Sequence, residues 1–426
     1  MTLPGSGRVA VTGVGVVAPG GSTRPAFWAS ITEGKTSTRR ISCFDPAPFR
    51  SQIAAEVDFD PAAAGLGPRD CRQMDRYVQF GLAATAEALA DSGLELDEPT
   101  RDRTAVAMGT AVGATITLEN EYVVCSDAGR DWLVSPDHPT PFLYQALMPS
   151  SLASEISRCH GLHGPAQVIS TGCTSGIDAI GVAYQLIVDG EADVAIAGAS
   201  DAPISPVTVA SFDAIKATTP ENDDPARASR PFDASRRGFV LGEGAAVLVL
   251  EEASRAAQRD AHVYCEIAGY ATRGNAYHMT GLRPDGLEMA ESITDAMREA
   301  RLDAAGLDYI SAHGSGTRQN DRHETAAYKR ALGHHAYQVP ISSIKSMIGH
   351  SLGAIGAIEM ATCALAIRHR AVPPTANWAS RDPECDLDYI PGSAREQRVG
   401  AALSVGSGFG GFQSAMVMVA PRGRQP

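Results

Sequence analysis

The order of predicted strands, turns and helices restricts the fold of this chain most strongly, because the same order occurs twice. Residues 166–188 read as a buried strand, a tight glycine-containing turn and a helix whose apolar side chains recur every three or four positions. Residues 340–367 repeat a strand, a glycine turn and a long apolar helix. A duplicated β-α-β unit predicts an α/β fold in which sheets are sandwiched between helices.

The rest of the sequence predicts where the chain divides into two halves and which strands and helices each half contains. No low-complexity linker separates them, so we expect one compact body with an N-terminal half at residues 1–260 and a C-terminal half at residues 261–426. Residues 119–149 are less regular, which favours an excursion over a site or a subunit interface. The other predicted strands are 9–17, 104–108, 192–197, 244–251, 264–270, 401–405 and 414–419, and the other predicted helices are 74–91 and 288–300.

The charge balance argues against one class of partner. The chain has 36 Lys and Arg against 49 Asp and Glu, a formal net charge of −13. Nucleic-acid binding depends on clustered cations that neutralise phosphates, so no nucleic-acid partner is expected. An acidic protein partner needs only a local basic patch. Arg69 and Arg72 are candidates for that patch, although a solvated helix face explains them as well.

The cysteines and the N-terminal residues bear on location. Eight cysteines are scattered singly, without a CxxC pair or the spacing of a metal site, so neither a disulfide framework nor a zinc site is expected. The N-terminal residues lack a charged region followed by a signal helix, and no stretch is expected to reach the ~18–20 apolar residues of a membrane span. The sequence therefore predicts a reduced, cytoplasmic protein that does not enter the membrane.

Cys173 differs from the other cysteines in its surroundings. It lies in TGCTSG, between the predicted strand and the start of the helix. A turn there exposes the side chain, and the following amides and the helix dipole favour a thiolate. The same amides can hold an oxyanion. A small buried thiol that packs like a hydrophobic side chain is the alternative that this turn alone leaves open.

Two histidines occupy comparable turns. His313 follows a predicted strand in SAHGSGT, and His350 precedes the second apolar helix in SIKSMIGHSLGA. Adjacent glycines allow the backbone of each turn to approach a ligand closely. Either histidine alone is more often a structural turn residue. Together with Cys173 they form a nucleophile and two imidazoles, a set that suits acyl transfer followed by carbanion chemistry.

Charged residues near the histidines are candidates for tuning them. Lys345 is five residues before His350, and Glu359 can neutralise that lysine in a buried pair. Asp321 and Glu324, in RQNDRHET, can form similar links. Ordinary surface ion pairing is the alternative for these residues. The remaining histidines lack a matching carboxylate or cysteine pattern, so no metal site is predicted.

Two glycine-rich runs need separate interpretations. SVGSGFGGFQS, at residues 404–414, is predicted to bring a backbone N–H near a reacting carbonyl, with Phe409 as a movable apolar gate; a plain β-turn is the alternative. The run VTGVGVVAPGG has glycines after a strand but neither GxGxxG spacing into a helix nor an acidic residue at a ribose position. A dinucleotide site is therefore not expected.

Four motifs carry a resemblance to a known family. TGCTSG, AHGSGT, SIKSMIGHSLGA and GSGFGG resemble, in this order, the signatures of β-ketoacyl-carrier-protein synthases, and the likeness runs over essentially the whole chain. SAHGSGTRQNDRHETAA, GLRPDGLEMAESI, DAPISPVTVASFDAIKATTP and PPTANWASRDPECDLDYIP are similar to the ketosynthase alpha subunit of type II, aromatic polyketide synthases. The resemblance implies a thiolase-like fold with two pseudo-symmetric halves.

The resemblance also implies partners and residue roles. An acyl carrier protein delivers substrates on its phosphopantetheine arm, no other cofactor is needed, and a silent chain-length factor of the same fold forms a heterodimer with the active subunit. Cys173 accepts the growing chain, its N–H and that of Phe409 form the oxyanion hole, and His313 and His350 assist decarboxylation. The supporting residues implied are Lys345, Glu359, Ser315 and Thr317, the last two as pantetheine contacts.

Rival functions remain distinguishable. A fatty-acid or polyene ketosynthase shares the catalytic residues. A biosynthetic thiolase normally has a second cysteine in the C-terminal glycine loop, which SVGSGFGGF lacks. A silent partner commonly has glutamine at the position of Cys173. The sequence leaves open the chain length, the starter unit, the cyclisation pattern and whether a homodimer or a heterodimer forms.

Overall fold

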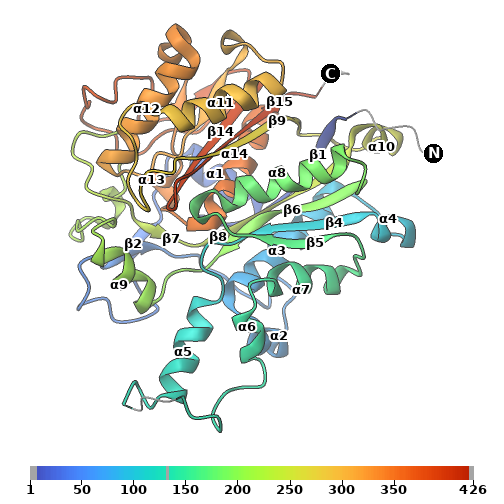
Figure 1. Ribbon diagram of the computed structural model, residues 1–426, viewed down its shortest axis with the longest axis vertical. Coiled ribbons are helices and arrows are strands. Elements are labelled where there is room, and N and C mark those ends of the chain that lie inside the picture. Colours follow the sequence, from blue (N-terminus) through green and yellow to red (C-terminus); the bar gives the residue numbers. More distant parts are fainter. Residues whose placement is uncertain (1–6, 131–133, 422–426) are drawn as a thin grey trace.

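A ten-stranded mixed sheet forms the framework of the computed structural model, which describes residues 7–130 and 134–421 (Figure 1). The strand order is β11-β10-β14-β15-β9-β1-β8-β6-β4-β5. The strands are β1 (Val9–Val17), β4 (Thr104–Gly109), β5 (Ala166–Ile169), β6 (Val194–Asp201), β8 (Gly244–Glu252), β9 (Cys265–Gly274), β10 (Tyr309–Ser311), β11 (Ile341–Ser342), β14 (Ala401–Gly408) and β15 (Phe412–Val419).

The sheet has the same strand senses on each side of its centre. Outward from β1, strand β8 is antiparallel to β1, β6 is antiparallel to β8, and β4 and β5 continue in parallel. Outward from β9, the strands β15, β14, β10 and β11 repeat these senses. Antiparallel pairing of β1 with β9 joins the two sides. The division of the chain into domains at residue 260 stays a prediction.

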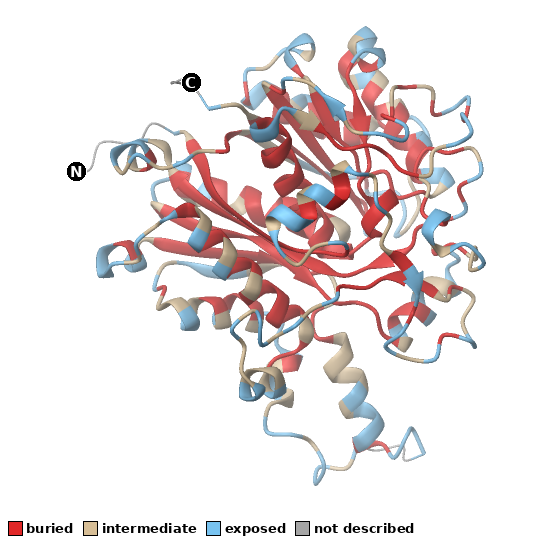
Figure 2. Cartoon of the chain, turned by 180° about the vertical axis from the view of Figure 1, so that it is seen from behind, coloured by how far each residue is buried: buried red, intermediate tan, exposed pale blue. Residues whose placement is uncertain are grey.

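The helices form three layers: one central layer between the two sides of the sheet, and one outer layer on each side. The central helices α8 (Ser175–Val188) and α14 (Ile355–His369) contact strands of both sides, so the twisted sheet encloses them. Figure 2 shows most of the large sheet and the helices inside it as buried. The outer helices are α3 (Arg76–Ser92) and α7 (Ser151–His160) on one side, and α11 (Leu287–Glu299) and α12 (Arg318–Leu332) on the other.

Two glycines allow the central helices to meet. A Cβ atom on Gly176 of α8 would lie 2.4 Å from the backbone nitrogen of Ala357 in α14. A Cβ atom on Gly356 would lie 2.9 Å from the backbone nitrogen of Ile177. Any side chain at these positions would push the helices apart. The glycines therefore set the spacing between the N-terminal ends of α8 and α14.

The expectation that no segment has the length and apolar character of a membrane span is wrong. The stretch Leu352–His369 passes that test by length and composition. However, 89% of it is buried inside the protein, where it forms the centre of the core. A helix that is apolar all round is buried in a large protein as readily as in a bilayer.

Residues 119–149 contain more regular structure than the sequence predicts. Helix α5 (Thr115–Cys125) and helix α6 (Leu143–Leu147) extend away from the main body (Figure 1). Their apolar side chains include Tyr122, Tyr144 and Leu147, which are exposed, so the burial pattern gives no helical signal. Trp132 lies outside the described residues.

The smaller elements complete the chain. The strands β2 (Thr38–Arg40), β3 (Ile53–Ala55) and β7 (Leu241–Gly242) form a small sheet, and β12 (Ala371–Val372) pairs with β13 (Arg395–Glu396). The other helices are α1 (Arg24–Thr32), α2 (Pro68–Gln73), α4 (Glu98–Asp102), α9 (Pro206–Ala214), α10 (Ala253–Gln258) and α13 (Lys345–Ile348), and the 3-10 turns are η1 (Gly172–Thr174), η2 (Pro225–Arg227), η3 (Ala304–Gly306), η4 (Gly333–Tyr337) and η5 (Leu352–Ala354).

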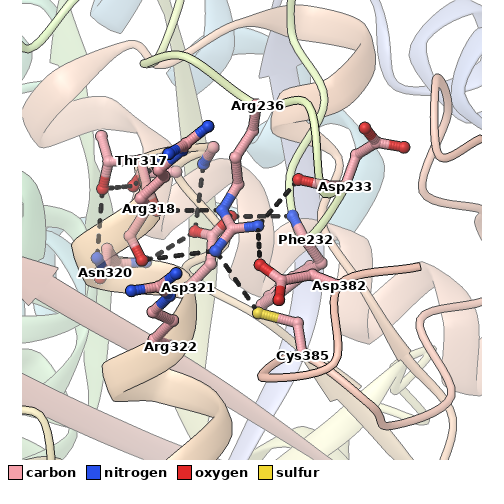
Figure 3. A network of polar contacts seen from close by, with 12 residues as sticks. Phe232, Asp233, Arg236, Thr317, Arg318, Asn320, Asp321, Arg322, Asp382 and Cys385 are labelled. Carbon is pink, nitrogen blue, oxygen red and sulfur yellow. Dashed lines mark hydrogen bonds and ion pairs between the residues drawn. The ribbon is translucent and has the colours of Figure 1, made fainter. Parts of the chain in front are cut away.

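A fully buried arginine fixes the loop around residue 236 to helix α12. Arg236 lies between Asp321 and Asp382 (Figure 3), with its Nε 3.1 Å from Asp321 and one terminal nitrogen 2.6 Å from Asp382. The same guanidinium donates to the backbone oxygen of Asp233 at 2.8 Å. A buried cation is tolerated only when partners replace its hydration, as they do here.

We predict that Arg236→Met lowers the free energy of unfolding by about 3–5 kcal/mol, because it leaves the carboxylate of Asp321 buried without its cation. The control is Arg298→Met, which removes an exposed pair with Asp295 and should cost less than about 1 kcal/mol. Urea unfolding followed by circular dichroism measures both variants. Equal losses in the two variants would contradict a structural role for Arg236.

Candidate active site

A pocket of about 210 Å³ collects most of the predicted site residues. Its walls come from the turn before α8, the turns after β10 and before α14, and the β14–β15 turn. The predicted residues that line it are Cys173, His313, Ser315, Thr317, His350 and Phe409. Segments that are far apart in sequence thus meet at one place, as their positions near strand and helix ends predict.

Cys173 lies in the turn η1 at the N-terminal end of α8. Gly172 before it has φ of +62°, which glycine adopts without strain. The turn touches the β14–β15 turn closely, since a Cβ atom on Gly408 would lie 2.8 Å from the carbonyl oxygen of Thr171. The backbone N–H of Phe409 forms a hydrogen bond with the Cys173 thiol. Two turns from opposite halves therefore enclose this sulfur.

The expectation that the turn favours a thiolate is wrong for the resting protein. Burial raises the pKa of the Cys173 thiol to about 12. The cation of Lys345 and the N–H of Phe409 lower this pKa, but they do not offset desolvation, and the carboxylates of Asp201 and Glu359 raise it further. At neutral pH the residue is therefore a protonated thiol on the pocket wall.

His350 has a defined tautomer. Its Nδ1 accepts a hydrogen bond from the backbone N–H of Leu352 at 3.1 Å. Burial, and then the cation of Lys345, hold the pKa of His350 well below its usual value, so the ring is neutral. A neutral ring that accepts at Nδ1 carries its proton on Nε2. His350 can therefore donate a hydrogen bond from Nε2.

His313 lies beside His350, with ring centroids 5.4 Å apart. Glu324 fixes its backbone by accepting the N–H groups of His313 and Gly314, each at 2.7 Å. The ring Nδ1 of His313 is buried and has no hydrogen-bond partner. Burial is the largest cause that lowers the pKa of His313, followed by the cation of Lys345. Both imidazoles are therefore neutral at physiological pH.

Lys345 and Glu359 form the buried pair that the sequence predicts. The Lys345 ammonium donates to the Glu359 carboxylate and, at 2.5 Å, to the backbone oxygen of His313. Burial raises the pKa of Glu359, and the ammonium of Lys345 opposes that rise. The pair lies in the helices α13 and α14 rather than on the pocket wall, so it acts through the field it creates.

The segment at residues 345–350 differs from the predicted glycine turn. Lys345 begins the one-turn helix α13, and Gly349 after it has φ of +67°. The helix turns the lysine inward, where Ser229 donates its hydroxyl to the Lys345 carbonyl at 2.6 Å.

Asp321 lies elsewhere than the predicted electrostatic role requires. Its carboxylate pairs with Arg236 and accepts the backbone N–H of Gly316 at 3.2 Å, so it holds the loop that carries Ser315 and Thr317. Ser315 and Thr317 contact each other through their hydroxyl oxygens at 3.1 Å on the pocket wall. Glu324, one turn further along α12, holds the backbone of the histidine instead.

Sequence reasoning missed Asp201, the last residue of β6. Its carboxylate accepts the N–H of Gly353 at 2.7 Å and the hydroxyl of Thr110 at 2.6 Å. It therefore fixes the turn that follows His350. Burial raises the pKa of Asp201 to about 6. A polar residue shortly after the buried strand predicted at residues 192–197 was the available signal, since strand ends commonly carry functional groups in α/β folds.

The arrangement combines a thiol with neutral hydrogen-bond donors. Two neutral imidazoles and the Cys173 thiol line one small cavity, and the backbone N–H of Phe409 reaches the same sulfur. Such donors stabilise negative charge on a carbonyl oxygen when water is excluded. Among the described residues, no group of three or more His, Cys, Asp and Glu side chains is arranged to hold a metal ion.

Comparisons with known proteins agree with the geometry. Residues 6–256 match the beta-ketoacyl synthase N-terminal domain, and residues 264–379 match the C-terminal domain. The tetracenomycin polyketide synthase ketoacyl synthase alpha subunit from Streptomyces glaucescens is 59% identical, over 99% of each chain.

Two solved structures share the whole fold. A type II polyketide synthase acyl-carrier protein in complex with its ketosynthase bound to the hexaketide gives a TM-score of 0.92, at 38% identity and covering 99% of this chain and 100% of the other. The ishigamide ketosynthase/chain length factor gives 0.90, at 31% identity and covering 97% and 99%. The predicted resemblance and thiolase-like fold are confirmed, and the chain belongs to the beta-ketoacyl synthase family.

Proposed function

We propose that this chain is the active ketosynthase subunit of a type II polyketide synthase, which lengthens a Cys173-bound acyl chain by decarboxylative Claisen condensation. The observation that carries the proposal is the meeting of Cys173 with two neutral histidines in one pocket. The identity of 59% to a polyketide synthase alpha subunit supports the polyketide assignment over a fatty-acid ketosynthase.

The first step is transfer of the acyl group to Cys173. The thiol attacks the thioester carbonyl of an acyl carrier protein and forms a tetrahedral oxyanion. The backbone N–H groups of Cys173 and Phe409 hold that oxyanion. The pantetheine sulfur leaves and takes up one proton, which balances the proton lost by Cys173. Because the resting thiol is protonated, this proton exchange belongs to the transfer step itself.

The second step uses the histidines. A malonyl thioester loses CO₂, and its electron pair becomes an enolate whose oxygen is held by donors from His313 and His350. Neutral imidazoles suit this role, because a ring fully protonated before reaction would bind the malonyl carboxylate and oppose its loss. The enolate carbon then attacks the Cys173 thioester, and the tetrahedral intermediate expels Cys173 as a thiolate. The thiolate takes up one proton and returns to the resting thiol, and the released chain is longer by two carbons.

Lys345 and Glu359 do not touch the substrates; they affect the cycle through the histidines and Cys173. The ammonium of Lys345 lowers the pKa of both rings and of the Cys173 thiol. It also holds the carbonyl of His313. Phe409 is 37% exposed at the pocket mouth, which fits an apolar gate. Ser315 and Thr317 are placed to contact a pantetheine arm, and no metal or redox cofactor enters the cycle.

The partners follow from the same proposal. The substrates arrive on an acyl carrier protein, and a chain-length factor of the same fold completes a heterodimer in the cytoplasm. The solved relatives, a carrier protein in complex with its ketosynthase and a ketosynthase/chain length factor, support both partners. The exposed apolar side chains of α5 and α6 also favour cover by a second subunit. A silent role for this chain is disfavoured by the thiol at position 173.

We predict that Cys173→Ala, co-expressed with the chain-length factor, elongates malonyl units at least about 10³-fold more slowly than the parent chain, because the acyl acceptor is gone. Mass spectrometry of the products and of acyl label on the protein measures the effect. The control is Cys159→Ala, which removes an exposed cysteine on α7 and should leave elongation unchanged. Elongation that survives in Cys173→Ala would contradict the proposed function.

We predict that alkylation of Cys173 by iodoacetamide becomes about tenfold faster per pH unit between pH 7 and 10. The reason is that only the thiolate reacts, and its fraction rises tenfold per unit below a pKa of about 12. Peptide mapping of the Cys173 segment after timed labelling gives the rate. A short cysteine peptide is the control and should level off near its ordinary pKa of about 8.5. A plateau for Cys173 below pH 9 would contradict the raised pKa of its thiol.

A further inference from the structure

Asp178 is a buried carboxylate that the steps above do not use. It lies in the first turn of α8, five residues after Cys173, and is only 4% exposed. Its oxygens accept hydrogen bonds from four hydroxyl groups, and among the described residues it forms no ion pair with a lysine or an arginine. Hydroxyl donors and the N-terminal end of a helix both stabilise such a carboxylate without a cation.

Two of the four hydroxyls belong to the turn that carries the nucleophile. One carboxylate oxygen of Asp178 accepts from Thr171 at 2.5 Å and from Thr174 at 2.8 Å. These residues flank Gly172 and Cys173 on both sides. The Thr174 hydroxyl also lies 2.9 Å from the carbonyl oxygen of Thr171, so it shares its single proton between this oxygen and Asp178 and closes the turn. The backbone around Cys173 is therefore pinned at both ends to a single side chain.

The other two hydroxyls come from the opposite half of the sheet. The second carboxylate oxygen accepts from Tyr270 of β9 at 2.9 Å and from Ser414 of β15 at 2.5 Å. Burial, and then the charge of Asp178, raise the pKa of Tyr270, so its phenol remains a donor. A Cβ atom on Gly181 would lie 2.6 Å from the Tyr270 ring, so a glycine one turn along α8 makes room for this contact.

Ser414 connects Asp178 to the Phe409 turn. Strand β15 begins at Phe412, directly after Gly410 and Gly411, whose φ angles are +93° and +90°. Such a turn has many accessible conformations, so its position depends on where its strand is anchored. The Ser414 hydroxyl anchors β15 two residues after its start. The carboxylate thus joins the two turns that supply the N–H donors of Cys173 and Phe409.

We infer that Asp178 is a positioning residue that holds the two backbone donors of the oxyanion hole in register across the two halves of the fold. The inference rests on the proposed function, because it assigns Asp178 to the step in which a thioester carbonyl becomes an oxyanion. It differs from a general packing role, since two of the four bonds end on the Cys173 turn and a third ends on the strand that directly follows the Phe409 turn. Displacing a donor weakens oxyanion stabilisation without removing the nucleophile.

The test compares two reactions of the same sulfur. Acylation by a small acyl thioester forms an oxyanion, whereas alkylation by iodoacetamide displaces iodide at a saturated carbon and forms none. In Asp178→Asn the new amide presents one acceptor oxygen in place of two. Co-expressed with the chain-length factor, this variant should acylate Cys173 about 10–100-fold more slowly than the parent. Its alkylation rate at the same pH should change by less than about threefold.

Further variants separate positioning from folding. Ser414→Ala removes only the link to β15 and should slow acylation in the same direction by a smaller factor. Asp189→Asn makes the same chemical change at the exposed C-terminal end of α8 and should alter neither reaction. Thermal unfolding of each complex shows whether the fold is intact, and Ser414→Ala tests the inference if Asp178→Asn fails to fold.

The outcomes distinguish the two proposals. Unchanged acylation in both Asp178→Asn and Ser414→Ala, with Cys173 still required for elongation, overturns this inference alone. An equal loss in the rates of acylation and alkylation also overturns it, because the substitution would then have changed the reactivity of the Cys173 thiol and not the oxyanion hole. Elongation without Cys173 overturns the proposed function itself. A selective loss of acylation in folded protein supports the positioning role.

Discussion

The close contact of α8 with α14 is the constraint on which the site depends. Gly176 and Gly356 leave no side chain between the two helices, so their N-terminal ends lie at one spacing. One end carries the turn of Cys173, and the turn after His350 leads into the other. A larger residue at either glycine would separate a nucleophile and a histidine that belong to different halves of the chain. The packing of these two helices in the core therefore sets the distance between Cys173 and His350.

Burial of charged groups around this centre explains the protonation states of the pocket. Asp201, Glu324 and Glu359 are each buried and each accept hydrogen bonds from the backbone or from Lys345. The carboxylates hold loops in place, while burial, and then the ammonium of Lys345, keeps both imidazoles neutral. The buried charged groups thus orient the loops of the pocket and keep the imidazoles neutral, and they do not produce a thiolate in the resting protein.

Much of the fold and most of the site could be predicted from the sequence, because strand-turn-helix order and the glycine turns are local patterns. What failed depended on tertiary packing. The pKa of Cys173 is set first by burial and then by groups that are distant in sequence, such as Lys345. Asp321 and Glu324 are three residues apart in one helix, and only the packing of α12 decides which one holds His313. Helix α5 was missed because its apolar side chains face outward, and Asp178 because hydroxyl partners leave no charge pattern.

The place of α14 in the chain has a consequence for biosynthesis. Its residues, 355–369, are made late, yet they cover strands β8, β1 and β6 from the first half. A nascent chain that stops before them has made β1, β6 and β8 but not α14, which covers their inner face together with α8. Exposed apolar faces in incomplete chains promote aggregation and recruit chaperones. The first half can therefore finish folding only after the ribosome has made α14. Truncated forms of this protein that lack α14 are poor candidates for stable fragments.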